Sequence, residues 1–180
     1  IQTELDQLVS IRTGHHDSGV VGGEIVRAKQ LIGEAKQATK TLMHDVKLGK
    51  RMEMTQVETI VEKMTDSILR NGDALVSLLR IKDADEYTYL HSMAVSALCI
   101  SFAQGLDLDS TKIKQIGIGG LLHDIGKMKV PLEILNKAGP LSEKEFEIMK
   151  RHVKDGASTL QEYPTLDQTC TCVTAHHHER

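Results

Sequence analysis

The sequence predicts an all-α protein, a helical bundle built around one core. Apolar residues recur at the 3.6-residue spacing of a helix in several segments, and runs that alternate like a β-strand are few. The three prolines all follow residue 130, so nothing breaks the earlier helical patterns. With 180 residues, the chain is long enough to bury the core of one ordinary domain.

The first part of the chain is predicted to be a linker followed by connecting helices. Residues 1–23 are expected to be an N-terminal remnant and linker, because the stretch "RTGHHDSGVVGG" is rich in glycine and polar residues. Residues 24–71 are expected to form connecting helices, the first over residues 24–48. Thr55 and Glu58 predict a capping box at the start of the second, and Asn71-Gly72 predicts its end.

Residues 72–180 are predicted to form the main domain. A helix over residues 87–104 is apolar on several sides, as expected of a central helix. Asp109 and Ser110 predict the start of the next helix, which is expected to close near Gly126. Ser142 and Glu145 predict a capping box for a further helix, and a last helix is expected from Leu166 to the end.

Composition excludes several classes of function. The net charge is −3, which does not fit a basic nucleic-acid-binding surface, and the 3% of aromatic residues makes a base-stacking platform a poor expectation. No apolar run reaches membrane-spanning length, and no signal peptide is visible. Three cysteines fit no disulfide framework. We therefore expect a cytoplasmic protein with no DNA partner and no membrane span.

Histidines at the predicted helices indicate a metal site. Four predicted helices each supply imidazole, at His91, His123, His152 and His176–His178. A single such histidine would more often be a satisfied core residue, but Asp124 follows His123 directly. Neutral imidazole and carboxylate suit iron, manganese, zinc or nickel, and a metal pair can clamp a phosphate. If the helix continues, Lys127 lies on the face of His123 and offers a positive charge to that phosphate.

Two stretches carry a resemblance to a known family. The residues "HDIGKMKVPLEILNKAGPLSEKEFEIMKRHV" and the later "HHER" resemble the HD-GYP family of the HD superfamily, the bacterial cyclic di-GMP phosphodiesterases. The resemblance covers about residues 72–180. It implies an HD-type bundle and hydrolysis of a cyclic dinucleotide, most simply cyclic di-GMP. It also implies signalling proteins such as GGDEF-type cyclases as partners.

The resemblance assigns roles to individual residues. The implied metal ligands are His91, His123, Asp124, His152, His177 and His178. Asp124 would bridge two divalent transition metals, with iron or manganese expected first and zinc or nickel as alternatives. Asp124 and Lys127 are the implied catalytic residues, and Lys127 would contact the substrate phosphate. A hydroxide bridging the metals would attack phosphorus in line.

The sequence departs from the family pattern at two places. Some members hold a third metal through a Glu four residues before the first ligand His, where this chain has Tyr87. Glu86 is one residue away, about a hundred degrees around a helix, so two metals are expected. The sequence stops at Arg180, before the expected GYP loop and a further ligand Asp. We therefore expect the 180 residues alone to bind metal weakly and hydrolyse little, with His177 and His178 poorly placed.

Two other functions fit the same residues. The first is hydrolysis of a different cyclic dinucleotide by another HD-type phosphohydrolase, and the second is a non-catalytic signalling module that binds partner proteins. Metal identity, the final product and the oligomeric state stay open. The remaining polar residues have ordinary explanations in a solvated linker, at the surface or beside the site: His15, His16, Asp17, His44, His176, Cys170 and Cys172.

Overall fold

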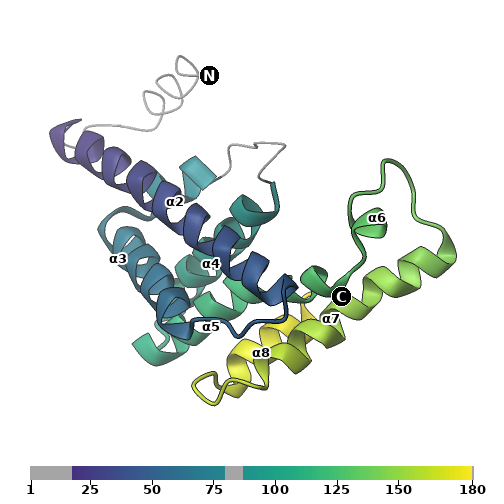
Figure 1. The fold of residues 1–180 in the computed structure, drawn as a ribbon. Coiled ribbons are helices and arrows are strands. Elements are labelled where there is room, and N and C mark those ends of the chain that lie inside the picture. The colour runs from purple at the N-terminus through teal and green to yellow at the C-terminus, as the bar shows by residue number, and fades with distance from the viewer. Residues whose placement is uncertain (1–17, 80–86, 180) are drawn as a thin grey trace.

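The computed structural model describes residues 18–79 and 87–179 (Figure 1). Those residues form seven α-helices and one 3₁₀-helix, and no strand lies among them. The predicted all-α fold class is therefore confirmed. The predicted N-terminal remnant up to Asp17, with His15 and His16, lies outside the described residues, and so does Glu86. Within the described ranges, no helix is both long and apolar enough to cross a membrane.

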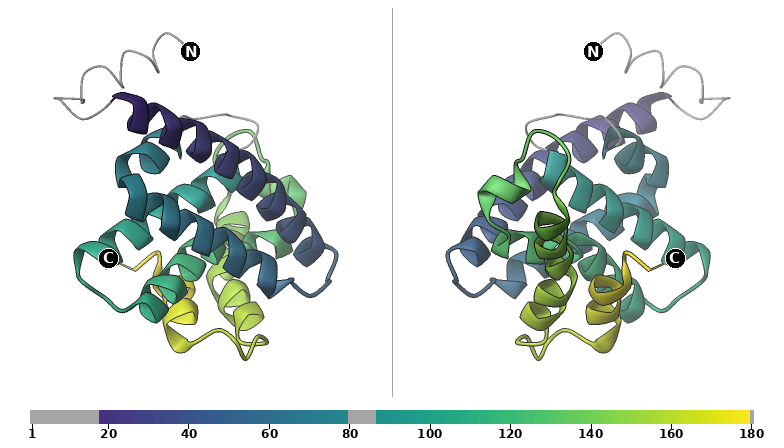
Figure 2. Two further views of the ribbon diagram at one scale, coloured as in Figure 1. Left: turned by 90° about the vertical axis from the view of Figure 1, so that its left-hand side faces the viewer. Right: turned by 90° about the vertical axis from the view of Figure 1, so that its right-hand side faces the viewer.

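The six longer α-helices pack in three pairs (Figure 2). The pair α2 (Ser18–Lys47) and α3 (Met54–Leu79) covers one side of the central pair α4 (Tyr87–Gly105) and α5 (Ser110–Leu122). The pair α7 (Glu143–Leu160) and α8 (Gln168–His176) covers the other side. As predicted, the central helix is deeply buried, and Met93, Ala97 and Ile100 are fully shielded from solvent.

Helix α2 begins earlier than the sequence indicated. It starts at Ser18, inside the stretch predicted to be a linker, and it runs through Gly22 and Gly23. Each glycine costs a helix only about 1 kcal/mol, which packing can offset. The buried Glu24 carboxylate anchors this end, because it accepts hydrogen bonds from Ser67 Oγ at 3.1 Å and Arg70 Nε at 3.0 Å of α3.

Helix α3 differs from the prediction at both ends. It starts at Met54, so Thr55 lies inside the helix and does not cap it, while Glu58 accepts from Lys114 Nζ of α5 at 2.7 Å. At Asn71 the backbone leaves the helical region, with φ −161° and ψ 93°. Asn71 Oδ1 then accepts from the Ala74 backbone amide at 3.3 Å, so the predicted helix end is a kink.

Side-chain caps define the later helices. Asp109 caps α5 through Lys112, as predicted, and Ser142 and Glu145 form the predicted capping box of α7. Helix α5 ends at Leu122, four residues before the predicted end, and the 3₁₀-helix η1 (Ile125–Lys129) and the short α6 (Leu132–Leu135) follow it. Helix α8 begins after its cap Asp167 and ends at His176, short of the predicted C-terminus.

Tyr163 joins the two outer helix pairs at one end of the bundle. Its hydroxyl oxygen accepts a buried hydrogen bond of 2.7 Å from the Met52 backbone amide, between α2 and α3. The guanidinium of Arg51 lies over the Tyr163 ring at 5.3 Å and donates to the Glu162 carbonyl at 3.2 Å. These contacts fix the loop after α2 against the loop between α7 and α8.

Candidate metal centre

Three histidines are held in one orientation by the same local contact. Each imidazole Nδ1 bonds to the backbone carbonyl three residues earlier: His123 to Gly120 at 2.8 Å, His152 to Met149 at 2.6 Å and His177 to Thr174 at 2.8 Å. A carbonyl oxygen only accepts, so the proton of each neutral ring sits on Nδ1. The Nε2 lone pair of each ring is then free to face inward.

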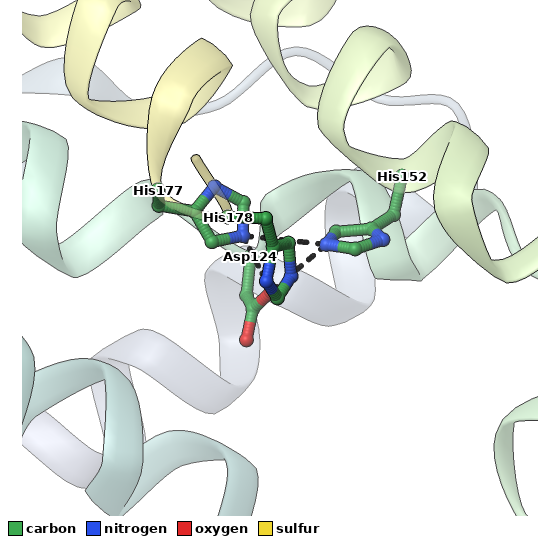
Figure 3. A group of neighbouring side chains, drawn as sticks. All are labelled: Asp124, His152, His177 and His178. Carbon is green, nitrogen blue, oxygen red and sulfur yellow. Dashed lines mark hydrogen bonds and ion pairs between the residues drawn. The ribbon is translucent and has the colours of Figure 1, made fainter. Parts of the chain in front are cut away.

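These Nε2 atoms converge on the two carboxylate oxygens of Asp124, and Figure 3 shows the rings of His152 and His177 beside it. Asp124 Oδ1 lies 3.4 Å from His152 Nε2 and 3.5 Å from His177 Nε2. Asp124 Oδ2 lies 3.1 Å from His123 Nε2 and accepts a hydrogen bond of 2.7 Å from Lys127 Nζ. The Asp124 carboxylate therefore presents Oδ1 to His152 and His177, and Oδ2 to His123.

The structure brings all six residues predicted to be ligands together, in two groups. In each group, donor atoms from every member lie within 4.8 Å of one another. The first group is Asp124, His152, His177 and His178, and the second is His91, His123 and Asp124. Asp124 belongs to both groups, which is the arrangement that a bridging carboxylate needs. The ligand role of each residue stays a prediction.

Burial sets the charge on these side chains. It lowers the pKa of His91, His152 and His177 below the ordinary value, which favours their neutral forms. Burial alone would raise the pKa of Asp124, but the Lys127 ammonium, which donates a hydrogen bond to Oδ2, helps to hold it well below its usual range. The site thus combines an ionised Asp124 carboxylate with imidazoles at His91, His152 and His177 whose neutral forms are favoured.

This donor set fits a divalent metal. Among the described residues, Asp124 Oδ1 is a buried atom that receives no hydrogen bond. A buried acceptor without a donor is costly, and here the imidazole lone pairs of His152 and His177 face it. A cation placed among these atoms would satisfy all of them, and imidazole with carboxylate suits first-row transition metals.

Lys127 reaches the site by a different route from the predicted one. Helix α5 has ended before it, so Lys127 does not share a helical face with His123. The chain enters η1 because Asp124 leaves the helical region at φ −98° and ψ 9°. That turn brings Lys127 Nζ to Asp124 Oδ2, with the lysine side chain 28% exposed. The lysine borders a cavity of about 990 Å³, to which Val95, Ile116 and Val173 contribute an apolar wall.

The expectation that His177 and His178 would be poorly placed is wrong. Both join the first group, with their ring centroids 4.2 Å apart. Helix α8 is held in place by the buried Cys170 and Thr174, which explains the placement. The helix ends at His176, and the turn after it lets two consecutive histidines face Asp124. His176 points elsewhere and pairs with Glu179 at 2.8 Å.

The sequence prediction missed the groups that orient the ligands. The carbonyls of Gly120, Met149 and Thr174 fix three rings, and each stands three residues before its histidine. This spacing is visible in the sequence, because positions i and i−3 are neighbours on a helix. Such contacts fix the tautomer and direction of a metal ligand.

Comparison with known proteins agrees with this geometry. The HD domain family matches residues 88–180 of the chain. The chain belongs to the HD domain family. The chain is 41% identical over 157 residues to cyclic di-GMP phosphodiesterase PA4108 of Pseudomonas aeruginosa, and this match covers 87% of the chain and 38% of that protein. The chain therefore spans about two fifths of that relative's length.

Two further proteins are similar to this HD-domain chain. The chain is 41% identical over 96 residues to 3'3'-cGAMP-specific phosphodiesterase 1 of Vibrio cholerae, and this match covers 53% of the chain and 22% of that protein. The solved structure of Bd1817, described as a HDG"Y"P protein from Bdellovibrio bacteriovorus, matches with a TM-score of 0.67 at 22% identity. That match covers 98% of this chain and 56% of Bd1817, and it confirms the predicted HD-type fold.

Proposed function

We propose that this HD domain is the catalytic part of a metal-dependent phosphodiesterase that hydrolyses a cyclic dinucleotide. The observation that carries the proposal is the Asp124 carboxylate, which presents Oδ1 to one histidine group and Oδ2 to another. A protein that only bound partners would have no need to gather five histidines around one buried carboxylate.

Each oxygen of Asp124 would help to hold one divalent ion. His152, His177 and His178 would complete the site at Oδ1, and His91 and His123 would contribute to the site at Oδ2. When bound, a pair of such ions supplies Lewis-acid activation of water and of the phosphate. Iron or manganese is our first proposal, and zinc or nickel also suits these ligands.

The chain's own groups prepare the site for a phosphodiester. The backbone carbonyls hold the imidazoles with Nε2 inward, so little reorganisation is needed when a metal binds. Lys127 is partly exposed at the cavity, where its ammonium would contact a phosphate oxygen and stabilise the charge that develops there. Its present partner, Asp124, keeps that ammonium within reach of the site.

The nature of the substrate rests on the relatives. The name of the Pseudomonas aeruginosa protein states cyclic di-GMP, and that match covers most of this chain. The name of the Vibrio cholerae protein states 3'3'-cGAMP, and that match covers about half of the chain. We therefore propose cyclic di-GMP as the substrate and 3'3'-cGAMP as the second candidate.

A product assay tests the proposal. The complete protein, loaded with Mn²⁺ or Fe²⁺, would be incubated with cyclic di-GMP, 3'3'-cGAMP or cyclic di-AMP, and the products separated by chromatography. We expect hydrolysis of cyclic di-GMP that Asp124→Ala abolishes. Faster hydrolysis of 3'3'-cGAMP would support the second substrate. Tight metal binding without hydrolysis of any of the three would contradict the proposed activity.

A further inference from the structure

The segment that follows Asp124 packs so closely against the backbone of α7 that it leaves no room for a side chain at Gly126. A Cβ atom on Gly126 would lie 1.9 Å from the His152 carbonyl oxygen and 2.6 Å from the Gly156 amide nitrogen. Both are backbone atoms, so no rotation of a side chain could relieve the clash. Gly126 has no positive φ, so an alanine could adopt its backbone conformation. The glycine is needed for space alone.

Gly156 completes this contact from the side of α7. A Cβ atom there would lie 3.3 Å from the Gly126 amide nitrogen and 3.1 Å from Cγ2 of Thr174 in α8. Three segments therefore meet at two glycines. They are η1, which follows Asp124 and contains Lys127, helix α7, which carries His152, and helix α8, which precedes His177 and His178.

We propose that Gly126 and Gly156 are positioning residues that set the separation of Asp124 and His152, and so the metal affinity of the first group. This inference rests on the proposed metal site. Asp124 stands two residues before Gly126, and the Gly126 contact is made to the carbonyl of His152 itself. The contact therefore fixes the two residues whose Oδ1 and Nε2 atoms lie 3.4 Å apart.

The size of the clash shows why affinity should depend on this contact. Ordinary van der Waals contact begins near 3.4 Å, so an alanine at position 126 would force η1 and α7 apart by about 1.5 Å. Metal–ligand distances tolerate deviations of only about 0.2 Å. A shift of this size would separate Asp124 from His152.

The test is a titration of chelator-treated protein with Co²⁺, followed by the visible absorption of the bound ion. This spectrum reports the ligands of the metal, which a general loss of stability does not alter in the folded protein. Gly126→Ala should weaken Co²⁺ binding by about 10- to 100-fold and change the spectrum, as loss of supporting contacts does at metal sites. Circular dichroism would verify that each variant is folded during the titration.

Two glycines provide matched controls. Gly33 in α2 has open space around it, so Gly33→Ala should leave binding unchanged. A Cβ atom on Gly117 would lie 2.8 Å from Val61 and 2.9 Å from Ile100, both side-chain atoms of the core. Gly117→Ala therefore adds a methyl group to a tightly packed part of the core away from α7. It should lower stability but keep the wild-type Co²⁺ affinity of the first group.

Gly156→Ala keeps the proposal testable even if Gly126→Ala does not fold. Its contacts are milder, and alanine suits a helix interior better than glycine, so this variant should fold and bind Co²⁺ several-fold more weakly. Wild-type affinity and spectrum in Gly156→Ala and in any folded Gly126→Ala would overturn the positioning role, as would an equal loss in Gly117→Ala. A wild-type protein that binds no Co²⁺ would instead refute the metal site itself.

Discussion

The Nε2 atoms of His152 and His177 lie 3.3 Å apart, and in the neutral rings neither carries a proton. Each ring already donates its Nδ1 proton to a backbone carbonyl, so this contact is not a hydrogen bond between neutral imidazoles. Both nitrogens also face Asp124 Oδ1, at 3.4 and 3.5 Å. Three electron-pair donors in this arrangement are best explained by a shared cation.

The first prediction concerns the metal-free protein, whose stability should rise from pH 5 to pH 7. Burial lowers the pKa values of His91, His152 and His177 in the folded state, and lysine or histidine neighbours lower each of them further. Below about pH 6.5, the unfolded chain therefore binds more protons than the folded one, which favours unfolding.

Urea unfolding of chelator-treated protein at several pH values measures this effect. His152→Gln should reduce the dependence of the free energy of unfolding on pH, because it removes one of the three histidines with a lowered pKa. A free energy of unfolding that stays constant or falls between pH 5 and pH 7 would contradict the assignment of neutral, buried histidines.

The second prediction separates the roles of Asp124 and Lys127. Asp124→Ala should lose metal and activity together, because both histidine groups share that carboxylate. Lys127→Ala should retain the metal but lose about 10²- to 10³-fold in rate, the typical effect of removing one group that stabilises transition-state charge. Metal content by elemental analysis and hydrolysis rate would be measured on the same samples. Equal loss of metal in both variants would show that Lys127 supports the metal site.

The sequence could predict features that depend on residues close to one another along the chain. Asp109 and Ser142 were recognised as helix caps because a cap bonds to an amide within the same turn. The kink at Asn71 and the early start at Ser18 depend on packing against other helices, which no local pattern records. Helix identity was therefore easier to predict than helix ends.

The candidate site likewise has features that the sequence could predict and features that it could not. The resemblance identified the six side chains that the structure brings together, because the family motif specifies the residue types and their order. The path of Lys127 could not be predicted, since it depends on where α5 ends and η1 begins. The placement of His177 and His178 depends on how α8 packs, which explains why that expectation failed.

The third prediction concerns the contact between the two outer helix pairs. Tyr163→Phe removes the acceptor of the buried Met52 amide proton, and an unsatisfied buried donor costs about 1–3 kcal/mol. Thermal or urea unfolding should show this loss, while Co²⁺ affinity should match the wild type because Tyr163 lies outside both histidine groups. An unchanged free energy of unfolding would mean that the Met52 amide finds another partner.

The fourth prediction is a stoichiometry of about two metals per chain. It follows from Tyr87 at the position where a third-metal Glu would stand, and from the two groups that share Asp124. Elemental analysis of anaerobically purified protein would measure the ratio of metal to protein. A firm ratio of three would contradict the prediction and would point to a further ligand.

The central claim is that Asp124 joins two metal sites, and anomalous diffraction from crystals grown with Mn²⁺ tests it most directly. The prediction is two anomalous peaks, one on each side of the Asp124 carboxylate. One peak should lie among His152, His177 and His178, and the other beside His91 and His123. Saturating Mn²⁺ with no anomalous peak within bonding distance of Asp124 would contradict the claim.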